Sequence, residues 1–387
     1  MRRVLCLGAS GSIGEQTLDI LASDRRHFVL KGISLGKRSE KIKPILQAFP
    51  TIEHICVQLE DDYLRLKEEY PTVTWHFGDR GLVEIIESCD CDMVVNALVG
   101  FAGLVPSVTA LSNDKILCLA NKESLVVGGA LIRELLGKGL GKLYPIDSEH
   151  VAIAKLLSRV NREDVDRILI TGSGGSFRDK SREELKDVTP AMALAHPTWS
   201  MGAKITIDSA TMMNKGFEVL EAKWLFDFPL ERTEILMHRE SYVHSVLKMK
   251  DGTYLADVSA PDMHGPIAYA LYETRVDFQL VKSPTLAEIG PYHFWEFDPK
   301  RYPAPGIAIS AFYEGGNACA ILNAANEEAV YSFLDGKLPF LSIEEVITEA
   351  LGAIMHIESP SLEDLIRTDG ETRAFVRRLV EERRGER

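Results

Sequence analysis

Hydrophobic positions in the first 146 residues fall into short apolar runs, separated by longer amphipathic segments. This alternation is typical of βαβ units built around a mainly parallel sheet. The predicted strands are Val4–Gly8, Phe28–Leu35, Ile55–Gln58, Val73–Phe77, Met93–Leu98, Lys115–Ala120 and Lys142–Pro145. The predicted helices between them include Ile13–Leu21, Lys41–Phe49, Leu82–Glu87 and Val105–Leu111.

The pattern changes between about residues 147 and 270. Ile168–Thr171 and Ile235–Met237 are predicted strands, and Ser181 with Glu184 has the spacing of a capping box for a short helix. A hairpin is predicted where Val243–Met249 and Thr253–Val258 flank Asp251-Gly252, because this dipeptide favours a two-residue turn. This region is therefore expected to be an α+β domain.

Proline and weak periodicity mark residues 274–300, which contain Pro284, Pro291 and Pro299 and are expected to form a linker arm. From Ile307 onward the apolar spacing becomes helical, which predicts a small helical bundle. Its predicted helices are Cys319–Leu334, Ile343–Met355 and Glu371–Glu382.

These patterns predict an α/β fold with a Rossmann-like parallel sheet domain, an α+β connecting and catalytic domain, and a C-terminal helical bundle. The expected boundaries are 1–146, 147–273, 274–300 for the arm, and 301–387. A chain of 387 residues is long enough for two or three domains.

Composition narrows the class of function. The net charge of −13 argues against a general binder of nucleic acid or membrane surfaces. No apolar stretch approaches the ~20 residues of a membrane span, and the chain enters a strand at once without a signal peptide, so we expect a cytoplasmic protein. The six cysteines form no CxxC pair and several lie in apolar runs, so we interpret them as reduced, buried thiols. A metal or redox site at Cys89-Asp90-Cys91 is the alternative.

A glycine loop, Gly8-Ala9-Ser10-Gly11-Ser12-Ile13-Gly14, joins the first predicted strand to the first predicted helix. Such glycines let the backbone turn tightly and approach a pyrophosphate, which the helix N-terminus then attracts. The spacing is GxxGxxG, and a glycine turn without a ligand is the competing interpretation.

The segment after the second predicted strand favours NADP over NAD. NAD-preferring enzymes usually place an acid there for the ribose 2′-hydroxyl, whereas this chain has Gly36, Lys37, Arg38 and Ser39. Two cations and a hydroxyl suit a 2′-phosphate. A solvated basic helix start is the alternative.

Three acids form a candidate metal site. Asp147 and Glu149 follow a predicted strand, and Glu218 lies one helical turn after Asn214. All-oxygen ligands suit Mg²⁺ or Mn²⁺ rather than Zn²⁺. Asp and Glu are also common at loops and helix caps, so the spacing leaves both interpretations open. We expect His150 to orient a neighbour.

Phosphate donors occur near these acids. Ser173 lies in a Gly/Ser loop with free backbone N–H groups, and Ser209, Asn214 and Lys215 add a hydroxyl, an amide and a cation. The segment 196–202 has a Trp and a Met between Pro and Gly. It is either a core anchor or a lid that folds Trp199 over a substrate and excludes water.

Several long motifs resemble those of the 1-deoxy-D-xylulose 5-phosphate reductoisomerase family, across nearly the whole chain. The matching segments are Gly8–Gly14, Asn96–Gly100, Leu119–Ser124, Asp147–His150, Thr171–Gly175, His196–Gly202, Lys204–Glu218, His244-Ser245, Pro261–Met263 and Leu322–Glu327.

The resemblance implies a homodimer that converts 1-deoxy-D-xylulose 5-phosphate to 2-C-methyl-D-erythritol 4-phosphate, with NADPH and Mg²⁺ or Mn²⁺, for isoprenoid precursors. The implied metal ligands are Asp147, Glu149 and Glu218. The implied substrate contacts are Lys122, Ser148, Glu149, Ser173, His196, Ser209, Asn214, Lys215 and Glu218. NADPH contacts are implied for Ser10, Gly11, Ser12, Ile13, Gly36, Lys37, Arg38, Asn121, Glu123 and Gly202. Catalytic roles are implied for Lys122, Glu149, His196, Trp199 and Glu221.

The chain departs from the usual family pattern at a few positions, none of them a proposed metal or phosphate ligand. Ser176 and Val151 replace a usual Pro and Asn, Ser10 replaces Thr, and His264 replaces Arg. His-Arg-Glu-Ser at 238–241 replaces His-Pro-Gln-Ser.

Two other functions fit part of the pattern. A two-domain NADP dehydrogenase of the semialdehyde or homoserine type would not need Asp147, Glu149 and Glu218 together. A non-enzymatic NADP sensor would leave Trp199 and Lys215 without a purpose.

Overall fold

The computed structural model describes residues 1–199, 201–274, 276, 278–279 and 284–385. Within it the chain folds into two compact units. The first comprises Met1–Ser124, Ala130–Ser148 and Asp262–Lys282, and the second comprises Leu125–Gly129, Glu149–Pro261 and Ser283–Arg387. Each unit thus contains segments that are distant in sequence.

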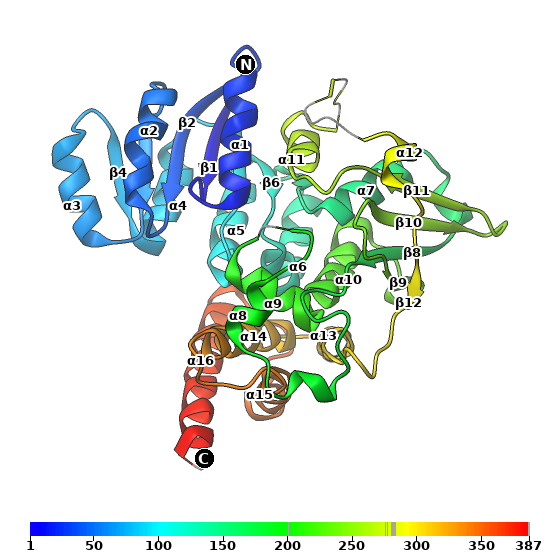
Figure 1. Ribbon diagram of the computed structural model, residues 1–387. Coiled ribbons are helices and arrows are strands. Elements are labelled where there is room, and N and C mark those ends of the chain that lie inside the picture. The colour runs from blue at the N-terminus through cyan, green and yellow to red at the C-terminus, as the bar shows by residue number, and fades with distance from the viewer. Residues whose placement is uncertain (200, 275, 277, 280–283, 386–387) are drawn as a thin grey trace. The chain divides into compact units, whose positions relative to one another are not determined.

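The first unit is built on a parallel sheet of seven strands in the order β4-β3-β2-β1-β5-β6-β7 (Figure 1). The strands are β1 Arg2–Leu7, β2 Phe28–Leu35, β3 His54–Val57, β4 Thr74–Phe77, β5 Met93–Asn96, β6 Ile116–Leu119 and β7 Lys142–Pro145. The strand order reverses direction between β1 and β5, which is where doubly wound sheets bind ligands. All seven strands lie at the predicted positions.

Helices cover this sheet because their apolar sides pack against its buried strands. They are α1 Ser12–Ser23, α2 Ile42–Ala48, α3 Glu60–Glu69, α4 Gly78–Ser88, α5 Leu104–Ser112, α6 Lys122–Gly137 and α11 His264–Leu271, with 3₁₀ turns at Ser39–Lys41 and Gly100–Gly103. Residues 125–129 of α6 belong to the second unit. Helix α11 packs against α1, β6 and β7, so the chain returns to the first unit after residue 261.

A five-stranded mixed sheet, β11-β10-β8-β9-β12, forms one part of the second unit. Its strands are β8 Val165–Gly172, β9 Thr233–Met237, β10 Val243–Met249, β11 Tyr254–Val258 and β12 Trp295–Glu296. Strands β10 and β11 pair antiparallel, and Gly252 between them has a φ of +89°, which confirms the predicted hairpin. Among the described residues of this second sheet, β8 and β9 pair in parallel and the other neighbouring strands pair antiparallel.

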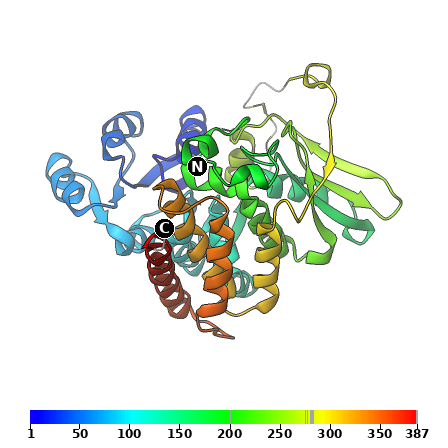
Figure 2. The same ribbon diagram turned by 60° about the horizontal axis from the view of Figure 1, so that its bottom comes forward.

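The helices of the second unit are α7 Ser148–Leu157, which starts one residue before the unit, α8 Pro190–Leu194, α9 Ala203–Thr211, α10 Met213–Phe226, α12 Leu286–Ile289, α13 Ala304–Glu314, α14 Ala318–Leu334, α15 Ser342–Ala353 and α16 Leu362–Gly385. All of these except α12, which has no buried residue, contribute to one apolar core shared with this sheet. Short 3₁₀ turns occur at Arg162–Asp164, Glu183–Leu185 and Leu230–Arg232. Helix α14 packs against α13, α15 and α16, which confirms helical packing at the C-terminal end (Figure 2).

The capping box predicted at Ser181–Glu184 is present, whereas the arm predicted at 274–300 is described only in part. Ser181 binds the Glu184 carboxylate through its N–H and hydroxyl, at 2.8 and 2.7 Å, beside the 3₁₀ turn Glu183–Leu185, so the helix there is only one turn long. The expected arm at 274–300 includes residues outside the described ranges, and its described part holds α12 and β12. The four-part division at 146, 273 and 300 stays a prediction.

All six cysteines are buried and unpaired, which agrees with the interpretation as thiols. Among the described residues, no helix is both long and apolar enough to cross a membrane.

Candidate nucleotide, phosphate and metal sites

The glycine loop of the first unit is shaped by close backbone approaches. Gly8 has a φ of +81°, and a Cβ atom there would lie 2.5 Å from the Ala97 carbonyl oxygen after β5. A Cβ atom on Gly14 would lie 2.2 Å from the Gly8 carbonyl oxygen. Gly11 ends the loop as the N-cap of α1, whose first N–H groups have no cap from a side chain. The loop therefore presents backbone N–H groups at the point where the sheet reverses.

Basic side chains after β2 meet this loop. The Arg38 guanidinium donates to the Ser10 carbonyl oxygen at 3.1 Å, and Gly36 and Lys37 are exposed beside it. Lys41 also reaches the Ser10 carbonyl, at 3.5 Å, and pairs with Glu15 of α1. The sequence analysis places Lys41 only at the start of a predicted helix and does not include it among the nucleotide contacts. Its position about one helical turn after Arg38 is the feature of the sequence that could have indicated this contact.

Other predicted residues of the first unit lie where β5, β6 and β7 end. Asn121 caps α6 by accepting from the Ser124 N–H at 3.0 Å, and its amide donates to Gly100 at 2.8 Å and to Glu123 at 3.2 Å. Its side chain therefore holds the loop structure. Lys122 is buried and pairs with Asp147, so the amine and the carboxylate stabilise each other.

In the second unit a sharp bend brings predicted residues together. Met212, with a φ of 64°, separates α9 from α10, so Ser209 lies near the end of one helix and Asn214 and Lys215 at the start of the next. Lys215 packs against the end of β8, since a Cβ atom on Gly172 would lie 3.2 Å from its Cε.

Lys215 is buried and joins two carboxylates. Its ammonium donates to Glu218 at 2.6 Å and to Glu149, and the Asn214 amide also donates to Glu218. Burial lowers the pKa of Lys215, but the charges of Glu149 and Glu218 outweigh burial and leave its pKa raised. The two carboxylates therefore favour the charged form of Lys215 at this position.

The position between Glu149 and Glu218 fits a divalent cation. These residues each offer a carboxylate oxygen, and the two oxygens lie within 4.8 Å of each other. The ammonium that both already bind shows that a positive charge is stabilised there, and oxygen ligands suit Mg²⁺ or Mn²⁺. Asp147 belongs to the first unit and precedes Glu149 by two positions in the chain.

His150 supports this pair from behind. It is fully buried, its Nε2 donates to the Glu218 carbonyl oxygen at 2.9 Å, and its Nδ1 lies 3.3 Å from Glu221. The Ser245 hydroxyl donates to the Glu149 carbonyl oxygen at 3.0 Å. These contacts fix the backbones that carry the two acids. Ser245, which was not among the predicted site residues, appeared only as part of a matching motif.

An imidazole and two hydroxyls form a second cluster beside Lys215. His196 Nε2 lies 3.3 Å from the Ser173 hydroxyl and 3.4 Å from the Ser209 hydroxyl. Its Nδ1 accepts the N–H groups of Thr198 and Trp199, at 3.1 and 2.9 Å. Nδ1 therefore carries no proton, and Nε2–H points to the hydroxyls.

Burial, assisted by the positive charge of Arg178, lowers the pKa of His196 to about 4. The imidazole is consequently neutral near pH 7. A bound phosphate would reverse the effect of Arg178 and favour the protonated ring. Arg178 was not among the predicted residues, because nothing in its local sequence marks it.

The predicted lid segment begins at His196. The Trp199 ring centroid lies 6.4 Å from that of His244, a buried histidine on β10 whose pKa burial lowers. Gly202 is exposed and caps α9, and Ser200 lies outside the described residues. The Trp199 indole thus lies near His244. Its role, either as a lid over the substrate or as a core anchor, stays a prediction.

Three family models match this chain. Those described as 1-deoxy-D-xylulose 5-phosphate reductoisomerase and its C-terminal domain match residues 4–129 and 143–226, and a DXP reductoisomerase C-terminal domain matches residues 258–375. The chain belongs to the 1-deoxy-D-xylulose 5-phosphate reductoisomerase family.

Curated members of this family align along their whole length. The reductoisomerase of Geobacillus sp. (strain WCH70) is 47% identical over 98% of this chain and 100% of its own. That of Bacillus subtilis (strain 168) is 44% identical, with the same coverage. The resemblance of the motifs is thereby confirmed.

Solved reductoisomerase structures share the fold. The enzyme from Zymomonas mobilis in complex with NADPH has a TM-score of 0.89 and 36% identity, covering 98% of this chain and 99% of that one. A reductoisomerase in complex with NADPH, fosmidomycin and magnesium has a TM-score of 0.92 and 33% identity, covering 98% of both chains. The predicted fold class is confirmed.

Proposed function

We propose that this chain catalyses the NADPH-dependent, divalent-metal-assisted rearrangement and reduction of 1-deoxy-D-xylulose 5-phosphate to 2-C-methyl-D-erythritol 4-phosphate. The observation that supports this most strongly is the contact of the buried Lys215 with the half-buried Glu149 and the buried Glu218, in a chain that aligns with members of the reductoisomerase family along their whole length. The relatives bound to NADPH and magnesium support both cofactors.

Asp147, Glu149 and Glu218 are the proposed metal ligands. When bound, the metal polarises the substrate's ketone and lowers the pKa of the adjacent hydroxyl, and NADPH provides the hydride. His150 and Ser245 hold the backbones of Glu218 and Glu149 and so limit how far the carboxylates move.

The substrate's phosphate is assigned to the cluster of Ser173, His196 and Ser209, together with Asn214 and Lys215. Two hydroxyls and the His196 Nε2–H converge within 3.4 Å, and the buried ammonium adds charge. Binding at this group, away from the reacting carbons, provides energy for orientation. Ser148 and Lys122 are the proposed contacts from the first unit.

Proton movements are assigned to Glu149, with Lys122 and Glu221 in support. A carbon–carbon bond of the substrate breaks and re-forms, and the resulting aldehyde is reduced. Trp199 covers the substrate, which keeps water from the aldehyde. NADPH is assigned to Ser10, Gly11, Ser12, Ile13, Gly36, Lys37, Arg38, Asn121, Glu123 and Gly202.

We also propose a cytoplasmic homodimer that interacts with neither nucleic acid nor membrane. Strand β11 lies at the edge of its sheet and exposes 59% of Tyr254, 38% of Leu255 and 38% of Val258. An exposed apolar edge strand favours pairing with another chain, which supports a second copy as the partner.

The test is oxidation of NADPH by the purified chain with 1-deoxy-D-xylulose 5-phosphate and Mn²⁺ or Mg²⁺. Turnover is expected, with loss on EDTA treatment and recovery when the metal returns. Folded protein that binds NADPH but gives no turnover would overturn the assignment. Glu218→Gln is expected to slow turnover by on the order of 10²-fold or more. A wild-type rate and metal dependence would remove Glu218 from the site.

A further inference from the structure

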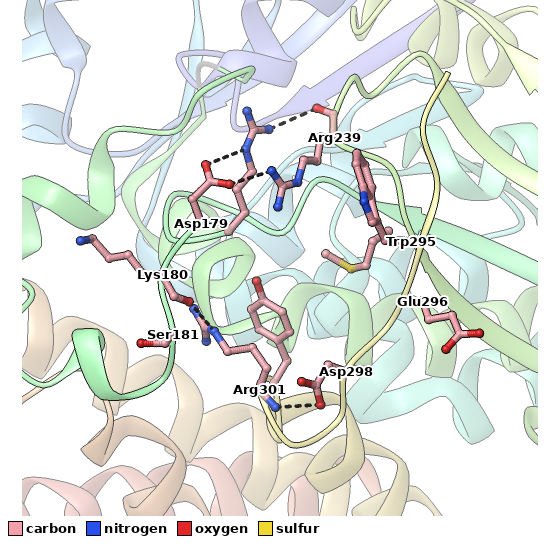
Figure 3. A pocket seen from close by; sticks show the side chains of 11 residues that line it. Asp179, Lys180, Ser181, Arg239, Trp295, Glu296, Asp298 and Arg301 are labelled. Carbon is pink, nitrogen blue, oxygen red and sulfur yellow. Dashed lines mark hydrogen bonds and ion pairs between the residues drawn. The ribbon is translucent and has the colours of Figure 1, made fainter. Parts of the chain in front are cut away.

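A pocket of about 410 Å³ lies in the second unit, lined by residues that the proposed function does not use (Figure 3). Its walls come from the loop 178–181, the end of β9, strand β12 and the turn before α13. This volume is within the range of about 300–1,000 Å³ typical of small-molecule sites.

Three arginines from separate parts of the chain line the pocket. Arg239 donates to Asp179 at 2.7 Å, and Arg178 donates to the Arg239 carbonyl oxygen at 3.2 Å. Arg301 donates to the carbonyl oxygens of Lys180 and Phe177, at 2.7 and 3.0 Å. Among the described residues, the Arg301 guanidinium is in no ion pair within 4.0 Å, although the charges of Glu344 and Asp298 act on it from farther away.

An aromatic wall accompanies these cations. Figure 3 shows Arg239 between Asp179 and Trp295, and the guanidinium carbon lies 4.9 Å from the Trp295 ring. Arg301 lies similarly over Tyr302, at 4.5 Å. These contacts limit the orientations of both guanidinium groups, and each guanidinium has further N–H groups beyond those in the hydrogen bonds above.

The acids of the pocket do not offset all of this charge. Asp179 is paired with Arg239, and the Asp298 carboxylate accepts the backbone N–H groups of Lys300 and Arg301, at 2.9 and 3.2 Å. Glu296 is exposed on β12. Arg178, Lys180, Arg239 and Arg301 outnumber these three acids, so the lining carries a net positive charge.

The pocket also adjoins the Gly/Ser loop after β8, which contains Ser173 of the proposed phosphate cluster. A Cβ atom on Gly174 would lie 2.8 Å from Arg178 and 3.5 Å from the Tyr302 hydroxyl, both of which line the pocket. The neighbouring Ser173 hydroxyl faces His196. Adjacent residues of one loop thus contact the substrate's phosphate cluster and this pocket.

We propose that this pocket is a second anion site, separate from the substrate's phosphate cluster, that binds a small phosphate monoester with a flat or apolar body. A phosphate offers three terminal oxygens to the three guanidinium groups of the lining, whereas a carboxylate offers two. Trp295 provides the surface for the body of the ligand.

The test is calorimetric titration of phenyl phosphate into the full chain in metal-free buffer. Arg239→Gln is expected to weaken binding about tenfold or more, and Trp295→Leu severalfold. Arg167→Gln is the matched control, because Arg167 pairs with Glu234 on the same sheet and does not line the pocket. It should leave binding unchanged. Ser209→Ala reports on the substrate's phosphate cluster, so it should weaken only binding at that cluster and leave the binding that Arg239→Gln weakens.

Four results would overturn the site. The first is no binding of phenyl phosphate at tens of millimolar, and the second is an affinity that Ser209→Ala lowers but Arg239→Gln does not. The third is an equal loss of affinity in Arg167→Gln and Arg239→Gln. The fourth is benzoate binding as tightly as phenyl phosphate. Circular dichroism checks that each variant folds. If Arg239→Gln does not fold, Trp295→Leu with the same controls decides. Turnover plays no part in this experiment, so its outcome is independent of the proposed function.

Discussion

The two proposed binding regions of this protein are built in opposite ways. In the first unit, the proposed nucleotide loop is formed by Gly8, Gly11 and Gly14 within one short stretch of sequence. Because Gly8 and Gly14 have no Cβ atom, the backbone at these positions can lie close to neighbouring carbonyl groups. In the second unit, Glu149, Ser173, His196 and Lys215 come from separate elements, and their charges and hydrogen bonds hold one another. One region therefore depends on steric fit and the other on charge balance.

Lys215→Met should give the largest effect, because it leaves the buried Glu218 and the half-buried Glu149 without their ammonium. The expected loss is ~3–5 kcal/mol of unfolding free energy in metal-free buffer, measured by urea denaturation. Mg²⁺ should restore more stability to this variant than to the wild type. Lys223→Met is the control, since its pair with Asp227 is on the surface of the same helix. Equal losses in both variants would show that charge balance does not hold this region together.

Gly14→Ala should come next, because its Cβ atom would meet the Gly8 carbonyl at 2.2 Å. Forcing this contact is expected to cost ~1–3 kcal/mol and to weaken NADPH binding strongly. Gly137→Ala is the control, because a Cβ atom on that glycine meets nothing within 4 Å. Unchanged NADPH affinity in Gly14→Ala, measured by fluorescence titration, would contradict the steric account of the loop.

Arg38→Gln tests whether ligand binding in the first unit also depends on charge. NADPH affinity should fall about tenfold while NADH affinity is unchanged, since only NADPH carries the 2′-phosphate. Arg26→Gln, at an exposed arginine of the same unit, should change neither affinity. Equal loss for both nucleotides would mean that Arg38 only supports the loop through Ser10.

The smallest effect concerns pH. The pKa of His196 is about 4 in the folded chain, below its ordinary 6.5, so the unfolded chain takes up the proton first. Its contribution to stability is present above about pH 6.5 and is lost as the pH falls toward 4. In the wild type, protonation linked to His196 should lower the unfolding free energy by on the order of 1 kcal/mol as the pH falls to 5, and His196→Gln should not show this loss. Denaturation at several pH values measures the difference. Ser173→Ala keeps the imidazole and should keep the dependence of the unfolding free energy on pH. If both variants lose this dependence equally, His196 is not the titrating group.

The predictions from sequence succeeded where information is local. All seven strands of the first sheet and the hairpin at Gly252 follow from apolar runs and turn residues. Lys41 and Arg178 were missed because their roles arise from positions in space, beside Ser10 and His196. The return of residues 262–282 to the first unit was not predicted either, since no periodicity specifies which sheet a helix joins.

The sequence alone determined the strand–loop–helix around Gly8–Gly14, the basic segment after β2 and the motifs that indicate the family, because each lies within a few consecutive residues. Only the tertiary structure decided that Lys215 joins Glu149 to Glu218, that His196 is a neutral Nε2–H donor, and that Arg178, Arg239 and Arg301 line one pocket. The physical reason is that burial and Coulomb interactions depend on distances between segments, which the order of residues does not specify.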